Sequence, residues 1–151
     1  MITLCKTCGT SYKTNGSHPA HCLICEDERQ YIPAEGQQWV DFDAHCASHT
    51  TTWKQHDSEL FSIRTVPGFA IGQRAFLLRT PQGNILWDCI ATLDDATKTL
   101  IASLGGLKAI AISHPHYYTA MQDWAAEFNA PIYLHANYRQ WMMRDLSLIH
   151  I

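Results

Sequence analysis

Apolar and polar residues in the second half of the chain follow patterns that predict strands. LFSIRTV (60–66) alternates between the two types, as a strand with one buried face does. AFLLRT (75–80) and NILWDCI (84–90) predict two further strands, which the turn sequence PQGN (81–84) joins as a hairpin. LKAIAIS (107–113) is an almost unbroken apolar run, which is typical of a strand buried on both faces.

Two segments with helical periodicity lie between and after these strands. TLDDATKTLIASLGG (92–106) carries an apolar stripe, and Thr92 is suited to cap its N-terminus. TAMQDWAAEFN (119–129) repeats apolar residues at helical spacing, with Thr119 as its expected N-cap. A strand and the start of another helix follow, in APIYLH (130–135) and ANYRQWMM (136–143). The order hairpin, helix, strand, helix, strand predicts an α/β layered domain with parallel crossover connections.

The N-terminal segment contains two C-x2-C pairs, formed by Cys5, Cys8, Cys22 and Cys25. Each pair makes a tight turn that directs two thiolates to one point, and two such turns supply the four ligands of a closed tetrahedral zinc site. We therefore expect residues 1–33 to be a small module stabilised by a structural Zn²⁺, and the segment resembles zinc ribbons. Iron is a lesser alternative, because CKTCGTSY also resembles a rubredoxin knuckle. His18 or His21 replacing a cysteine is another lesser alternative, since four thiolates already saturate zinc.

Residues 34–59 are polar, with isolated aromatic residues and no clean period. This pattern predicts a linker, with a short helix near 36–46, between the module and a domain over 60–151. DAHCASH also offers three metal-binding side chains, those of His45, Cys46 and His49. No second knuckle accompanies them, so a second metal site here is disfavoured, and Cys46 is expected to be half-buried and apolar in character.

Composition narrows the classes of function. The chain has 151 residues, 46% hydrophobic and 17% charged, with a net charge of -3, so nothing in its charge favours a nucleic acid or an anionic membrane as partner. No apolar run approaches the ~20 residues that span a bilayer. The paired cysteines suit a reducing compartment and bound metal, and MITLCKTCGT lacks the layout of a secretory signal. We expect a cytoplasmic protein.

A candidate catalytic site follows the strand of residues 107–113. Pro115 biases His114 toward an extended conformation, and residues two apart on an extended segment project to the same side. His114 and His116 can therefore face one metal ion, a possible second Zn²⁺, beyond the end of a buried strand, where ligands gather in α/β sheets. Asp88 ends a neighbouring predicted strand, and is expected to orient a histidine through its ring N–H.

A hairpin ending in ILWD, a helix, an apolar strand and H-x-H resemble the N-terminal half of the metallo-β-lactamase fold, an αββα sandwich. The resemblance covers roughly residues 60–144, and it implies that His114 and His116 bind the first metal. The family motif is H-x-H-x-D-H, so Tyr118 and Thr119 stand where the second metal's ligands belong. Tyr118 either packs in the core or donates a hydrogen bond to substrate. His135, at the end of the next predicted strand, is a candidate third ligand or a buried or capping histidine.

These observations give two main hypotheses and a weaker third. The first is a metal-dependent hydrolase of a small-molecule substrate, present here as a fragment whose missing C-terminal half packs on residues 60–151; the abrupt apolar end SLIHI favours a fragment. The second is a non-catalytic binding or scaffolding module that keeps the fold and the zinc ribbon. A nucleic-acid-binding ribbon protein is the weakest, because basic residues of the module are offset by acidic ones.

Overall fold

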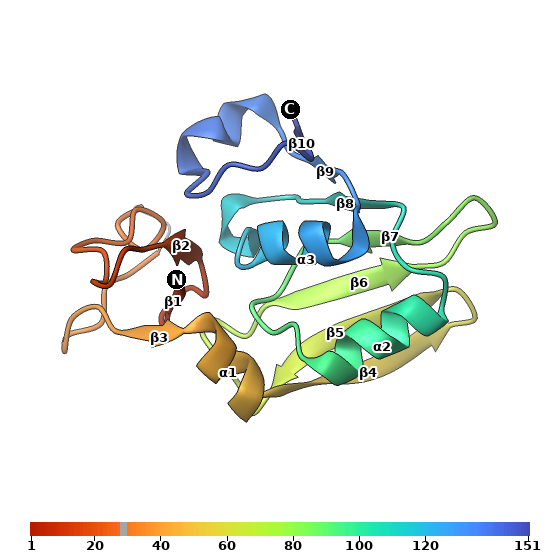
Figure 1. Cartoon of the computed structure of the whole chain (residues 1–151), viewed down its shortest axis with the longest axis horizontal. Coiled ribbons are helices and arrows are strands. Elements are labelled where there is room, and N and C mark those ends of the chain that lie inside the picture. Colours follow the sequence, from red (N-terminus) through yellow and green to blue (C-terminus); the bar gives the residue numbers. More distant parts are fainter. Residues whose placement is uncertain (28–29) are drawn as a thin grey trace.

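The computed structural model describes residues 1–27 and 30–151, and they form two sheets (Figure 1). The smaller sheet is antiparallel, with the order β2-β1-β3. Its strands are β1 (Ile2–Cys5), β2 (Ser11–Lys13) and β3 (Trp39–Asp41). Leu4 of β1 is fully buried and pairs with Val40 of β3. The smaller sheet is therefore completed by a strand that lies far from β1 in the sequence.

The larger sheet has seven strands within the described residues, in the order β10-β9-β8-β7-β6-β5-β4. Neighbours from β4 to β7 run antiparallel, and neighbours from β7 to β10 run parallel. The strands are β4 (Thr50–Asp57), β5 (Leu60–Val66), β6 (Arg74–Leu78), β7 (Ile85–Trp87), β8 (Ala109–Ala111), β9 (Ile132–Tyr133) and β10 (Ile149–His150). The α/β class, the hairpin and the parallel crossovers predicted from the sequence are confirmed.

Helices cover one face of the larger sheet. In the described part of the chain, the α-helices are α1 (Phe42–Ser48), α2 (Asp95–Ser103) and α3 (Met121–Phe128), and the 3₁₀ helices are η1 (Pro115–Tyr117) and η2 (Ala136–Trp141). In Figure 1 both α2 and α3 lie in front of the sheet. Ile101 of α2 and Trp124 of α3 join one buried apolar cluster with strand residues such as Leu86. No helix of the described residues is both long and apolar enough to cross a bilayer.

The opposite face of the larger sheet is only partly covered. Register places Phe76, Trp87, Ala111 and Tyr133 in one row across four strands, on the face away from Leu77 and Leu86. Trp87 is 48% exposed and Tyr133 is 50% exposed. We call this surface the open face. Residues 107–113 are therefore not buried on both sides, since Ala109 and Ala111 flank the buried Ile110 and are only partly covered.

Residues 34–59 are not the linker that their composition predicts. They contain β3, α1 and β4, so this stretch completes the smaller sheet and supplies an edge strand of the larger one. The physical reason is that an edge strand tolerates polar side chains on both faces. Only Thr51 and Trp53 of β4 are partly buried, so the alternating signal is weak.

Two predicted helix caps are wrong. The N-cap of α2 is Asp94, whose carboxylate accepts from the backbone N of Thr97, whereas Thr92 lies before the helix and contacts His45. The N-cap of α3 is Ala120, without a side-chain hydrogen bond. Thr119 instead has a positive φ of 37°, and its carbonyl accepts a hydrogen bond from the backbone N of Ser11 in β2.

Candidate metal centre

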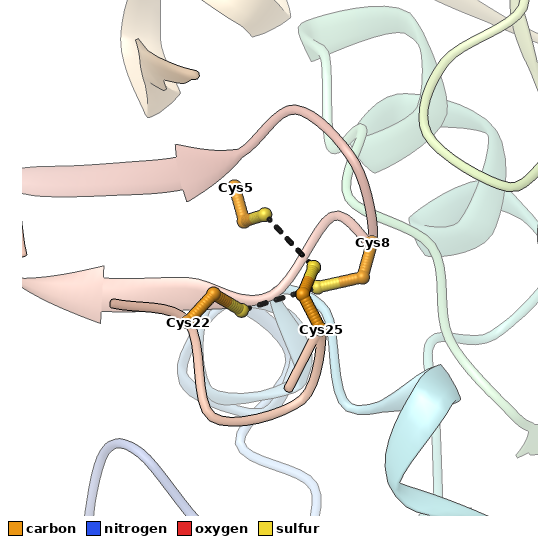
Figure 2. Close-up of side chains that lie close together, drawn as sticks. All are labelled: Cys5, Cys8, Cys22 and Cys25. Carbon is orange, nitrogen blue, oxygen red and sulfur yellow. Dashed lines mark hydrogen bonds between the residues drawn. The ribbon is translucent and has the colours of Figure 1, made fainter. Parts of the chain in front are cut away.

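The four cysteines converge on one buried point (Figure 2). Their sulfur atoms, in Cys5, Cys8, Cys22 and Cys25, all lie within 4.8 Å of one another. The Sγ atoms of Cys5 and Cys25 are 3.5 Å apart, and so are those of Cys8 and Cys22. Four thiolates at this separation match the ligand set of a closed tetrahedral site, so the geometry fits a zinc ion.

Backbone hydrogen bonds build the first knuckle. Cys5 ends β1, and its carbonyl accepts from the N–H of Gly9 at 2.8 Å, while its own N–H donates to Thr10 at 2.9 Å. Gly9 has a φ of 79°, which a residue with a Cβ adopts only with strain. The turn therefore returns the chain to β2 with Cys5 and Cys8 on its inner side.

Polar groups around the sulfur atoms also fit a bound metal. The Tyr12 hydroxyl donates to Cys22 Sγ at 3.1 Å, and Thr10 Oγ1 lies 3.1 Å from Cys8 Sγ. Gln37 Oε1 lies 3.3 Å from Cys5 Sγ, while its buried Nε2 has no hydrogen-bond partner in the described part of the chain. Rotating this amide by half a turn places the N–H donor on the sulfur, which is the arrangement that a metal-bound thiolate requires.

Electrostatics favour the thiolate form at two of the four positions, because the pKa values of the Cys5 and Cys22 thiols both lie below the usual value. Hydrogen bonds from neighbouring thiols, Cys25 first, hold the pKa of the Cys22 thiol well below its usual value. Burial raises the pKa of the Tyr12 hydroxyl, so this group stays protonated and donates. A cysteine held as thiolate is the form that ligates metal.

The two histidines of the H-x-H sequence lie in one loop beyond β8. His114 precedes η1, and its Nδ1 accepts from the backbone N of His116 at 3.2 Å. The two imidazole centroids are 4.4 Å apart, and the ring of Tyr138 lies 5.5 Å from that of His114. Because Nδ1 of His114 faces the backbone, its Nε2 is the ring atom suited to bind a metal in this conformation.

Asp88 lies beside this loop and contacts it through Ser113. Its Oδ1 accepts from the backbone N of Ser113 at 2.8 Å and from the Ser113 hydroxyl at 2.7 Å. Asp88 is buried and has a φ of 63°, a conformation that Asp tolerates better than most residues. The carboxylate therefore fixes the backbone immediately before His114.

Tyr118 and His135 both lie beside Tyr138. Tyr118 is buried, its hydroxyl donates to the Tyr138 carbonyl at 3.2 Å, and burial raises its pKa to about 12. His135 is exposed, and its Nδ1 accepts from the backbone N of Asn137 at 3.1 Å. Among residues 1–27 and 30–151, the four cysteines are the one group of three or more metal-binding side chains that converge, so His114, His116 and His135 do not converge on one point.

Several residues that sequence reasoning did not identify connect two parts of the molecule. One is the smaller sheet with its four cysteines, the cysteine unit, and the other is the loop after β8 that contains His114 and His116, the histidine loop. The carbonyl of Thr119 accepts from the backbone N of Ser11 at 3.0 Å and from its hydroxyl at 2.7 Å. A Cβ at Gly9 would meet Thr119 Cγ2 at 3.4 Å, so Gly9 packs closely against the Thr119 side chain. Gln73, also buried, bridges Cys8 and His116. No local sequence pattern signals these contacts, because each joins distant segments.

Comparison with known proteins gives one curated relative and distant structural neighbours. No protein-family model matches the chain. Over 149 residues, 97% of the chain, it is 44% identical to the uncharacterized protein YmaE of Bacillus subtilis (strain 168). The match covers 54% of YmaE, so the chain spans about half the length of this relative.

Two solved structures resemble part of the fold. A crystal structure of VMB-1 matches with a TM-score of 0.48 and 13% identity, over 60% of this chain and 45% of that chain. A metallo-β-lactamase from Erythrobacter litoralis matches with a TM-score of 0.42 and 15% identity, over 64% of this chain and 47% of that chain.

Proposed function

We propose that this chain is part of a metal-dependent hydrolase of the metallo-β-lactamase-like class, with a structural zinc ion in its four-cysteine unit. The observation that carries the proposal is the position of His114 and His116. Both follow β8, at the carboxyl end of adjacent parallel strands, where α/β proteins bind their ligands.

The cysteine unit is structural in this proposal. Four buried thiolates complete the coordination of zinc and leave no open position for water or substrate. The unit packs against the histidine loop through Ser11 and Gly9, so its metal maintains a surface that the loop needs.

The histidine loop holds the catalytic metal in this proposal, together with a third ligand that the described residues do not bring beside it. Zinc held there would lower the pKa of a bound water and polarise an ester, thioester, amide or phosphoester bond of a small-molecule substrate. Asp88 maintains the loop through Ser113, and the Tyr118 hydroxyl stays protonated beside Tyr138.

The part of the open face over β7, β8 and β9 is the surface on which the second half of such a hydrolase packs. Trp87 and Tyr133 lie in one row there, each about half exposed, and two sheets pack face to face by burying such rows. About half of YmaE lies outside the matched region, which leaves room in that relative for a second sheet.

Zinc analysis of the purified protein tests the proposal. About two zinc ions per chain support a histidine site in addition to the cysteine site. The variant His114→Ala/His116→Ala should then lose one equivalent, while the control His21→Ala/His150→Ala, at two exposed histidines, should lose none. Equal zinc content in the wild type and in His114→Ala/His116→Ala would show that the histidine loop does not bind zinc.

The second candidate is a non-catalytic binding or scaffolding module with the same fold. The observation in its favour is that the described residues bring no third metal-binding side chain beside the histidine pair. This candidate predicts about one zinc ion per chain, bound by the cysteines alone.

A further inference from the structure

A basic pocket lies at the β4 edge of the open face. Its volume is about 280 Å³, and its lining includes Lys54, His56, Ser62, Arg64 and Arg74. Lys54 comes from β4, Arg64 from β5 and Arg74 from β6, so three neighbouring strands each place one cation on its wall. The pocket is separate from both the cysteine unit and the histidine loop, since neither lines it.

Two of the cations stand directly opposite each other. Arg64 pairs with Arg74 in the β5–β6 register, so both side chains project to the same face of the sheet. Like charges at directly opposite positions destabilise a sheet. Lys54 occupies the same face beside Ser62, which places a third positive charge nearby. An anion bound among the three would relieve this repulsion.

Within residues 1–27 and 30–151, no acidic side chain lines this pocket. In the part of the chain that the structure describes, the ion pairs do not include Lys54, Arg64 or Arg74. The whole chain has a net charge of -3, so this concentration of positive charge is local.

Two contacts hold polar groups in place around the pocket. The guanidinium of Arg74 lies over the ring of Phe76, 5.1 Å from its centroid, and such cation–π contacts restrict a flexible side chain. His56 Nε2 and Ser62 Oγ are 2.8 Å apart. The pocket therefore combines pre-positioned cations with neutral hydrogen-bonding groups.

We propose that this pocket binds a small molecule through its phosphoryl group. Arginine presents N–H groups in a fork that matches the oxygen atoms of phosphate, and charge-assisted hydrogen bonds of this kind are the strong ones. Three cations balance the double negative charge of a phosphoryl group better than the single charge of a carboxylate. Neither the four-cysteine metal nor the histidine site is needed for this binding.

Calorimetric titration of the chain with inorganic phosphate, at ionic strength held constant with chloride, tests the proposal. Phosphate should bind and should raise the unfolding temperature. Arg64→Gln, which leaves the Arg74–Phe76 contact intact, should weaken phosphate binding by about tenfold or more. The matched control Arg79→Gln lies beyond β6 and outside this pocket, so it should bind phosphate like the wild type.

Unfolding without phosphate gives a second, independent measurement. Arg64→Gln removes the like-charge pair, so it should unfold at a higher temperature than the wild type in phosphate-free buffer and should gain less from added phosphate. Equal stabilisation of wild type and Arg64→Gln by phosphate would overturn the proposal. So would the absence of phosphate binding, or binding of succinate as tight as that of phosphate at the same ionic strength.

Discussion

The side-chain amide of Gln73 donates a hydrogen bond to the backbone carbonyl of His116 at 3.0 Å. The same nitrogen donates to the carbonyl of Cys8 at 2.6 Å, and the Gln73 side chain is buried. One amide group therefore uses both of its N–H bonds to join the first cysteine knuckle to the histidine loop. The two candidate metal sites are mechanically connected through a residue that ligates neither.

Replacing this amide should loosen both segments. Gln73→Leu leaves two largely buried carbonyls without their donor, which should lower the free energy of unfolding by about 2–3 kcal/mol in urea titrations. Hydrogen exchange of the amides over 116–119 should accelerate. Gln82→Leu makes the same substitution at an exposed hairpin position and should change neither quantity. Unchanged exchange over 116–119 in Gln73→Leu would contradict the proposed connection between the two segments.

Local patterns account for most of what the sequence could predict. β5 forms over the same residues, 60–66, that alternate in the sequence. The four cysteines meet because each C-x2-C knuckle is a local turn, so spacing alone carries the information. β4 could not be predicted from such a pattern, because its position at the edge of the sheet lets polar residues such as Lys54 and Gln55 occupy a strand.

The parts that sequence could not predict depend on long-range contacts. Gln73 lies 65 residues from Cys8 and 43 from His116, so no periodicity links them. Two strand ends predict that Asp88 lies near the histidine loop, but the hydrogen bonds that Ser113 donates to it depend on how the backbone packs. Spacing could not show that His135 turns to cap η2.

The Tyr12 hydroxyl should strengthen the binding of zinc by the four cysteines. Its hydroxyl donates to Cys22 Sγ, and removing such an outer hydrogen bond typically weakens metal binding by about tenfold or more. Tyr12→Phe should therefore release zinc to a chromophoric chelator at a lower chelator concentration than the wild type. Tyr31→Phe, at a residue that is 59% exposed, should match the wild type. Identical competition curves for the two variants would show that the hydroxyl does not act on the metal.

Asp88 should stabilise the histidine loop by geometry and by charge, and three variants separate these effects. Asp88→Ala removes the acceptor of two hydrogen bonds from Ser113, so the free energy of unfolding should fall by about 3 kcal/mol. Asp88→Asn retains an acceptor oxygen and tolerates the positive φ, so its loss should be smaller. Ser113→Ala loses only the hydroxyl contact and should be the mildest. If Asp88→Ala is no less stable than Ser113→Ala in urea titrations, the backbone N–H contact contributes nothing.

His45 should make the stability of the fold depend on pH in the acidic range. Its ring is fully buried, Nε2 lies 2.7 Å from Thr92 Oγ1, and burial, with a smaller effect of His49, lowers its pKa from 6.5 to about 4. At pH 7 the ring is neutral in both states. Between pH 6.5 and pH 4 the unfolded chain takes up a proton that the folded chain does not, so stability falls as the pH falls.

The expected loss from His45 is about 2 kcal/mol between pH 6.5 and pH 5. His45→Gln keeps a polar side chain toward Thr92 and does not titrate, so its free energy of unfolding should fall less over this range. The control His21→Gln, at an exposed histidine, should retain the wild-type slope. Protonation of the cysteine site affects all three proteins alike, so the difference in slope isolates His45. Parallel slopes for His45→Gln and the wild type would mean that this histidine accepts its proton inside the folded protein.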